Sequence, residues 1–388
     1  MERTTLSLMQ LIKSEICGKP ISAELRDSIG EDDVEKLYSL SKKHDMAHLV
    51  ASALEHAGLT FESEYAKKLK TQKLLATFRY AQLAHEFRSL CSVLEEAGIQ
   101  FIPLKGSVMR SYYPEPWMRT SCDIDILVRE ADLERAKNII VSELEYEAGK
   151  VNSHDIGMIS PSGVHFELHY SLIEEDEFAA FDEVLKNVWQ YAEPIRGSEY
   201  HCRLSDSMFY YYHTAHMAKH YMHGGCGIRP FADLILLDTE DADVLRERES
   251  LLSRGGLSAF AKSALHLARV WFSDAEHTDL TQQMERLILG GGVYGNRENH
   301  VVIQQSKRGG KFKYAISRIW LPYDDLRFYY PSLNGRRWLL PFYEVKRWCR
   351  LIFSKQSRKR SVAELRATSN VTDEDKMFIQ AHLKQLEL

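Results

Sequence analysis

The stretch FIPLKGSVMRSYYPEPWMRTSCDIDILV, residues 101–128, decides the fold of this chain. It opens with a short apolar run, turns at Lys-Gly-Ser (residues 105–107) and closes with Asp-Ile-Asp-Ile-Leu-Val (residues 123–128). Alternation of acidic and apolar residues predicts a β-strand, because successive side chains leave opposite faces of a sheet. Asp123 and Asp125 are therefore expected on one face. Two carboxylates at this spacing repel each other unless a cation lies between them, and hard divalent ions such as Mg²⁺ prefer such oxygen ligands.

The turn before this strand has the composition of an anion-binding loop. Gly106 has no side chain, so it lets the backbone approach a ligand closely. Residues 107–112 are predicted to form a short helix, whose first N–H groups would point at an anion. Lys105 and Ser107 add a positive charge and a hydroxyl. The turn is therefore a candidate phosphate-binding site that faces the acidic strand.

A second alternating run, residues 164–170, supplies a third acid. Glu167 and His169 share the polar face of this predicted strand, and apolar residues occupy the other face. The turn at residues 160–163 joins it to residues 157–159, which predicts a hairpin. A register error of one residue would turn Glu167 away from the two aspartates. The expectation is that the polar face turns toward them.

The ordered set of strand, Gly-Ser turn, Asp-x-Asp strand and later acidic strand resembles the polymerase-β-like nucleotidyltransferase superfamily. Lys105, Arg119, the Glu-Leu-His of residues 167–169 and a later His-rich helix make the chain similar to one branch, the bacterial "uncharacterised nucleotidyltransferase" family. The resemblance is carried by residues 101–170 and continues more loosely to Trp338. It implies an enzyme that moves a nucleoside monophosphate from an NTP, with ATP expected, to a hydroxyl. The acceptor, which could be a small molecule, a protein or an RNA end, stays open.

The resemblance also implies roles for individual residues. The expected catalytic and metal-binding residues, for Mg²⁺ or Mn²⁺, are Asp123, Asp125 and Glu167. The expected nucleotide-binding residues are Lys105, Gly106, Ser107, Arg119, His169, His216, His220 and Arg229. Arg119 suits a phosphate because its fork allows bidentate contact.

Four histidines, His213, His216, His220 and His223, have spacings of three, four and three, which places them on one face of a helix. They are interpreted as lining the nucleotide cleft. A transition-metal site is an alternative, since imidazole suits Zn²⁺ and related ions, but one straight helix cannot surround an ion alone. Solvated surface histidines are the third reading.

Arg229 lies near the start of the following helix, where it could reach a phosphate. Asp233 could orient Arg229 or a histidine, or the two could form an ordinary surface ion pair.

Each short motif alone is also what a plain turn or a solvated sheet face shows. Two other function classes therefore stay open. One is a catalytically silent nucleotide-binding or interaction module on the same fold. The other is a metal-dependent hydrolase that uses the His-rich helix.

Composition narrows the class of protein. The chain has 388 residues, so two or three domains are expected. A formal net charge of −5 argues against an extended nucleic-acid-binding surface, which needs a basic footprint. Six scattered cysteines are typical of reduced thiols. No signal peptide and no transmembrane run is evident, and a cytoplasmic protein is predicted.

The predicted fold class is α+β, mostly helical overall, with a small mixed β-sheet core between two helical regions. The predicted regions are residues 1–98 (helical), 99–204 (nucleotidyltransferase core) and 205–388 (helical). The aromatic and basic segment 312–353 is interpreted as helices packed on the core, with a membrane-surface face as the alternative. A basic linker at 355–360 precedes a last helix, which Thr372 and Asp375 are expected to cap.

Overall fold

The computed structural model describes residues 3–173, 179–292, 323, 326, 330–333, 335–353 and 372–388. Its contacts divide the chain into two units. The first comprises residues 1–219, 228–285 and 387, and the second comprises residues 220–227, 286–386 and 388. The predicted boundaries after residues 98 and 204 both lie inside the first unit, and the three-region division stays a prediction. The basic linker at 355–360 lies outside the described residues.

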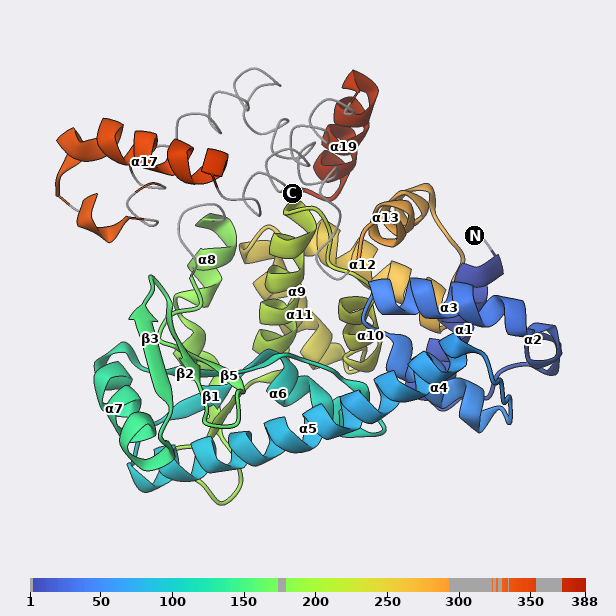
Figure 1. Cartoon of the computed structure of the whole chain (residues 1–388), viewed down its shortest axis with the longest axis horizontal. Helices are drawn as coiled ribbons and strands as arrows, with labels where there is room; N and C mark the ends of the chain where they lie inside the picture. The colour runs from blue at the N-terminus through green and yellow to red at the C-terminus, as the bar shows by residue number, and fades with distance from the viewer. Residues whose placement is uncertain are drawn as a thin grey trace. The chain divides into compact units, whose positions relative to one another are not determined.

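The chain is mostly helical and contains a small mixed sheet of five strands, as the sequence predicts (Figure 1). The N-terminal helices are α1 (Arg3–Cys17), α2 (Ala23–Ser28), α3 (Glu31–Lys43), α4 (Ala47–His56) and α5 (Glu64–Glu96). Helix α5 ends just before Gly98, whose φ of 64° is the left-handed conformation that glycine adopts at helix ends. The chain turns at Gly98 and then enters the first strand of the sheet.

The sheet has the strand order β1-β2-β5-β4-β3. Its strands are β1 (Phe101–Pro103), β2 (Asp123–Val128), β3 (Glu147–Val151), β4 (Asp155–Ile159) and β5 (His165–His169). Strands β2 and β5 are parallel, and the other pairs are antiparallel. The predicted hairpin is confirmed, since β4 pairs with β5 across the turn at residues 160–163.

One face of the sheet is apolar and packs on helices. Ile124 and Ile126 of β2 and Phe166 and Leu168 of β5 are completely buried in a cluster that also holds residues of α5 and α7 (Leu133–Leu144). Burying a side chain of this size stabilises a fold by about 1.5–3 kcal/mol. A one-residue slip would expose all four, so the core fixes the register and keeps the polar face of both strands on the opposite side.

Short elements connect and follow the sheet. They are α6 (Lys105–Met109), the 3₁₀ turns η1 (Arg110–Tyr112), η2 (Pro116–Met118), η3 (Glu130–Asp132) and η4 (Val188–Tyr191), α8 (Ala179–Leu185), and the paired strands β6 (Ala192–Pro194) and β7 (Cys202–Leu204). The following helices are α9 (Asp206–Met222), α10 (Arg229–Leu236), α11 (Ala242–Arg254), α12 (Ser258–Phe272) and α13 (Asp279–Gly290). Helix α12 packs against both α10 and α1, which joins early and late segments of the chain in the first unit.

In the second unit the described elements are η5 (Pro331–Leu333), η6 (Arg337–Leu339), α17 (Leu340–Phe353) and α19 (Asp373–Gln385). The predicted capping box at the start of α19 is confirmed: the Thr372 hydroxyl accepts from the Asp375 N–H, and the Asp375 carboxylate accepts from the Thr372 N–H. Among the helices that the structure describes, none combines the length and apolarity needed to cross a membrane.

Candidate active site

Three carboxylates meet on the polar face of strands β2 and β5. Asp125 lies directly opposite Glu167 in the parallel register, and Asp123 precedes Asp125 by two residues, which puts it on the same face. Asp125 is almost completely buried, whereas the Glu167 side chain remains 36% exposed. The predicted orientation of the third acidic strand is confirmed, because its polar face turns toward the aspartates.

Two cations stand between Asp125 and Glu167. Lys105 Nζ lies 2.7 Å from Asp125 Oδ1 and 3.8 Å from Glu167 Oε2. His169 Nε2 lies 3.1 Å from the same Asp125 oxygen and 3.2 Å from Glu167 Oε2. We call these four residues, together with Asp123, the carboxylate cluster. Lys105 and His169 thus offset the repulsion between the two acids.

The protonation of the carboxylate cluster follows from burial and from these contacts. Burial alone would raise the pKa of Asp125, but Lys105 and the hydrogen bond from His169 outweigh it and hold that pKa below the usual range. Burial also acts to lower the pKa of His169, yet its bonds to Asp125 and Glu167 raise it to about 9. Burial and the negative charge of Asp125 raise the pKa of Asp123. Asp123 is thus the acid that a cation would relieve most.

The turn before the cluster is held under strain. Lys105 adopts a left-handed backbone conformation, with φ of 44°, which costs a non-glycine residue on the order of 1 kcal/mol. Such conformations persist where surrounding structure enforces them, and they gather at ligand sites. Gly106 serves packing as well, because an added Cβ would lie only 3.0 Å from the Ser121 Cβ. The close approach at this glycine is therefore made by the protein itself.

Two buried polar atoms near the turn have no hydrogen-bond partner within the described part of the chain. They are the hydroxyl oxygen of Ser107 and Nε of Arg110. Arg110 donates through its other end to the Ser121 hydroxyl, and burial lowers its pKa to about 10. Buried polar groups are normally paired. The Ser107 hydroxyl therefore has hydrogen-bonding capacity to offer a ligand beside Lys105.

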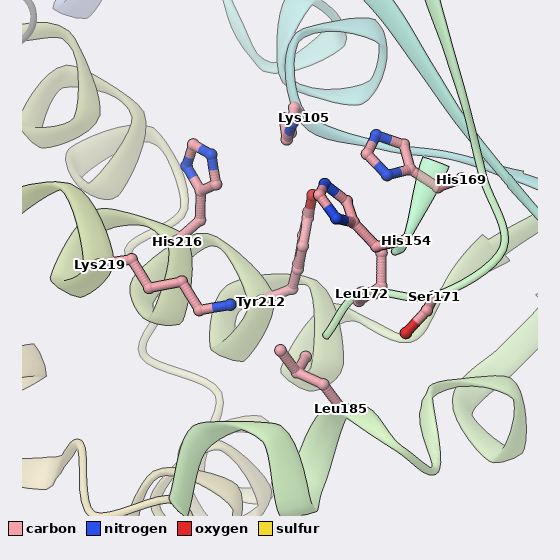
Figure 2. Close-up of a pocket in the computed structure, with 9 residues that line it drawn as sticks. All are labelled: Lys105, His154, His169, Ser171, Leu172, Leu185, Tyr212, His216 and Lys219. Atoms are coloured by element: carbon pink, nitrogen blue, oxygen red, sulfur yellow. The ribbon is translucent and has the colours of Figure 1, made fainter. Parts of the chain in front are cut away.

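A small pocket adjoins the carboxylate cluster, and about 340 Å³ of empty space, part of it open solvent, lies within and around it. It is lined by Lys105, His154, His169, Ser171, Leu172, Leu185, Tyr212, His216 and Lys219. Figure 2 shows Tyr212, His216 and Lys219 projecting from α9 into this space, with His154 and His169 on the side of the sheet. The lining is rich in cationic and imidazole groups, which suits an anionic ligand.

The sequence interpretation of the histidine helix is only partly matched by this geometry. His216 lines the pocket, whereas His213 lies against α10 with its Nε2 at 3.3 Å from the Pro230 carbonyl oxygen. His220 belongs to the second unit and is not among the described residues that line the pocket. Tyr212 and Lys219 were missed, although their spacing of four and three residues from His216 places them on the same helix face.

Arg119 and Arg229 lie in a second charged group. Arg119 forms a two-pronged bond with Asp233, with Nε 2.8 Å from Oδ1 and Nη2 2.8 Å from Oδ2. The Tyr113 hydroxyl donates to the same carboxylate at 2.8 Å. Arg229 Nη1 donates to the Thr120 carbonyl oxygen at 2.6 Å. We call these residues, with Asp45 at 3.4 Å from Arg229, the arginine cluster.

The arginine cluster corrects two sequence-based alternatives for Asp233. This residue is completely buried, so it is not part of a surface ion pair, and its direct partner is Arg119 rather than Arg229 or a histidine. Burial would raise the pKa of Asp233, but the adjacent Arg119 guanidinium lowers it below the ordinary value. Both guanidinium groups are thus engaged by protein partners that hold the loop before β2.

The donor set of the carboxylate cluster fits a hard divalent ion. Carboxylate oxygens of Asp125 and Glu167 lie within 4.8 Å of each other, and Asp123 adds a third carboxylate from the same face. Oxygen ligands of this kind suit Mg²⁺, which keeps further positions for phosphate and water.

Comparisons with known proteins give one family. A family described as "Uncharacterised nucleotidyltransferase" matches residues 30–273, more than half of the chain and all of the site described above. The CCA-adding enzyme of Thermotoga maritima, solved in complex with tRNA, is 11% identical and covers 79% of this chain and 83% of its own, with a TM-score of 0.21. A score that low supports no inference. No curated protein matches the sequence.

Proposed function

The chain belongs to the uncharacterised nucleotidyltransferase family, and on that premise we propose that it transfers a nucleoside monophosphate from an NTP to an acceptor hydroxyl. The observation that carries the proposal is the register of β2 and β5. It sets Asp125 opposite Glu167, with Asp123 on the same face, at the mouth of a cationic pocket. Such an arrangement supplies metal ligands, a base and a phosphate site within one cleft.

Asp123, Asp125 and Glu167 are the residues that would hold Mg²⁺ or Mn²⁺. When bound, the ion neutralises charge on the leaving pyrophosphate and lowers the pKa of the acceptor hydroxyl. The strained turn at Lys105 and the unpaired Ser107 hydroxyl would bind the phosphates of the NTP, expected to be ATP. The pKa of Lys105 lies well above its ordinary value despite burial, because Tyr212 and Asp125 favour the charged form, so it stays cationic at neutral pH.

In the transfer step, the acceptor oxygen forms a bond to the α-phosphorus, and the bond from that phosphorus to the bridging oxygen breaks. Pyrophosphate leaves, and the hydroxyl proton passes to Glu167, whose side chain is 36% exposed, whereas Asp125 is buried. His169 Nε2 bonds both Glu167 and Asp125 and so keeps the base in place. His216 lines the pocket where an anionic part of either substrate would lie, and Lys219 lines it as well, with its Nζ 3.7 Å from Asp182 Oδ1.

We place Arg119 and Arg229 in a positioning role. Arg119 donates to Asp233 and to the Thr120 carbonyl oxygen, and Nη1 of Arg229 donates to the same carbonyl oxygen, which anchors the loop leading into β2. A direct phosphate contact would require breaking these buried bonds, at a cost of several kcal/mol.

The test is incubation of the protein with each α-labelled NTP, Mg²⁺ and a cell extract, followed by identification of the labelled species. Transfer of label by the wild type, but not by Asp123→Asn, supports the proposal. Thermal stabilisation by NTP and Mg²⁺ without any transfer would instead favour a silent nucleotide-binding module. If NTP and Mg²⁺ neither stabilise the protein nor lead to transfer, an NTP is not the substrate and the proposal is wrong.

A further inference from the structure

A second group of potential metal ligands lies beside the carboxylate cluster and contains two imidazoles. His154 immediately precedes strand β4, Asp155 begins that strand, and Asp155 pairs directly with His169 of β5. One ligand atom from each of these three residues lies within 4.8 Å of the others. Ligands about 2.1 Å from a tetrahedral ion lie about 3.4 Å apart, so the three side chains would close in on a bound ion.

His169 carries a nitrogen that nothing in the described chain satisfies. Its Nε2 faces Asp125 and Glu167, but its Nδ1 is buried without a hydrogen-bond partner, and the side chain is only 6% exposed. A buried polar atom left unpaired costs about 1–3 kcal/mol. Strand β4, with Asp155, flanks β5 on the side away from β2 and Asp125. A metal ion on that side would take the place of the Nδ1 proton, while the Nε2–H goes on donating to Asp125 and Glu167.

The other two residues are held in a manner suited to metal binding. The Nδ1 of His154 lies 3.2 Å from the Ser153 hydroxyl, and its Nε2 lies 3.4 Å from Asp155 Oδ2. A proton on Nδ1 leaves the lone pair of Nε2 directed to the side of Asp155. Asn152 donates to Asp155 Oδ1, which orients the carboxylate and leaves Oδ2 available. Supporting hydrogen bonds of this kind are typical of metal sites.

We propose that His154, Asp155 and His169 bind a borderline divalent transition-metal ion of the Zn²⁺ class, at a site that shares His169 with the carboxylate cluster but uses none of its three acids. Two imidazoles and one carboxylate match the ligand preferences of such ions, whereas Mg²⁺ prefers oxygen alone. Three protein ligands leave a coordination position open. Because His154 and His169 both line the pocket (Figure 2), an ion held by them would lie beside the space where an anionic substrate group is expected to bind.

The proposal does not depend on nucleotidyl transfer, and its test reads metal directly. Protein freed of transition metals is titrated with Zn²⁺ by calorimetry in a buffer that contains excess Mg²⁺ and no nucleotide. The bound zinc is then quantified after gel filtration. The expected result is one zinc per chain. His154→Ala should weaken zinc binding by at least about 10–100-fold, the loss seen even for supporting residues of metal sites.

Two controls locate the ion. Glu167→Gln should retain zinc, whereas an ion bound by Asp125, Glu167 and His169 would be lost in that variant. His165→Ala removes an exposed histidine from the same strand and should change nothing. His154→Gln, with thermal melting of each variant, separates ligand loss from misfolding. Absence of zinc in the wild type, zinc kept in both His154 variants, or zinc lost in Glu167→Gln overturns the proposal.

Discussion

The carboxylate cluster and the arginine cluster are both built from buried charges, but they differ in what they leave unused. In the arginine cluster both oxygens of Asp233 are bonded, by Arg119 and Tyr113, and Arg119 also donates to the Thr120 carbonyl oxygen. Beside the carboxylate cluster, the Ser107 hydroxyl is unpaired within the described chain. Because the hydrogen-bonding groups of Asp233 are all used within the protein, the arginine cluster is expected to stabilise the fold. Because a hydroxyl next to the pocket is unpaired, the carboxylate cluster is expected to bind a ligand.

The largest expected effect is on catalysis and separates the clusters most sharply. Asp123→Asn should lower nucleotidyl transfer by more than roughly 10⁴-fold, because ion-derived stabilisation of the transition state is worth several kcal/mol. Stability should hold or rise, since the raised pKa of Asp123 means that its charged form is unfavourable in the fold. Label transfer and thermal melting measure the two effects, with the exposed Asp32→Asn as control. Activity within tenfold of wild type would contradict the assignment.

Glu167→Gln tests the base within the same cluster. Transfer should fall by roughly 10²–10⁴-fold, the loss typical of a positioned proton acceptor. Nucleotide binding should change little, because Lys105 and Ser107 are expected to carry it. Single-turnover rates and equilibrium binding of a nonhydrolysable NTP analogue separate these effects. A parallel loss of binding and rate would assign Glu167 to the binding of nucleotide instead.

In the arginine cluster the loss should appear in stability. Arg119→Ala leaves Asp233 buried without its cation and should cost about 3–5 kcal/mol in the free energy of unfolding. The double variant Arg119→Met, Asp233→Leu removes both charges and should be less destabilised than the single variant. Chemical denaturation measures all three proteins. Equal stability of Arg119→Ala and wild type would show that the ion pair between Arg119 and Asp233 does not stabilise the fold.

A pH dependence is expected next to the arginine cluster. Burial lowers the pKa of His213, which stays neutral in the fold and contacts Pro230. Because the unfolded chain then binds the proton more readily, stability should fall as the pH drops below the ordinary value near 6.5. The slope that His213 adds is at most about 1.4 kcal/mol per pH unit. Denaturation at pH 7.5 and 5.5 should show a weaker dependence in His213→Asn, and an unchanged slope would contradict this role.

Ser107→Ala should have the smallest effect. Its hydroxyl has no partner within the described chain, so the free energy of unfolding should change by less than about 0.5 kcal/mol. Affinity for NTP should fall roughly tenfold, the value of a hydrogen bond to a charged group. The matched control is Ser111→Ala, because Ser111 is exposed and lies in η1, the turn that follows α6. Unaltered NTP affinity would place the phosphates elsewhere.

The sequence predicted what depends on local spacing. Alternation around Asp125 and Glu167 was enough to predict both strands and the face that each acid shares. The structure pairs the two strands in parallel with both acids on one face, as this prediction requires. The register is fixed by apolar residues on the opposite face, such as Ile124 and Phe166, which must stay buried. The helix cap at Thr372 was predictable for the same reason, since capping needs only residues three apart.

Contacts between distant segments were not predictable from spacing. The pairing of Arg119 with Asp233 joins residues 114 positions apart, and no local pattern encodes it. The His154–Asp155 dipeptide was visible in the sequence, but its meeting with His169 depends on the register of β4 against β5. The place of Lys219 in the pocket was not predictable either, because a lysine at helical spacing is as typical of a solvated helix face.

The separation of Arg119 from Asp233 also has a consequence for the order of events during synthesis. Arg119 emerges from the ribosome 114 residues before the aspartate that neutralises it. At about 5–20 residues per second, this delay is roughly 6–23 s. Until α10 is made, the loop leading into β2 carries a cation whose buried partner does not yet exist. Strand β2 is therefore expected to reach its native position only after residue 233 has been synthesised.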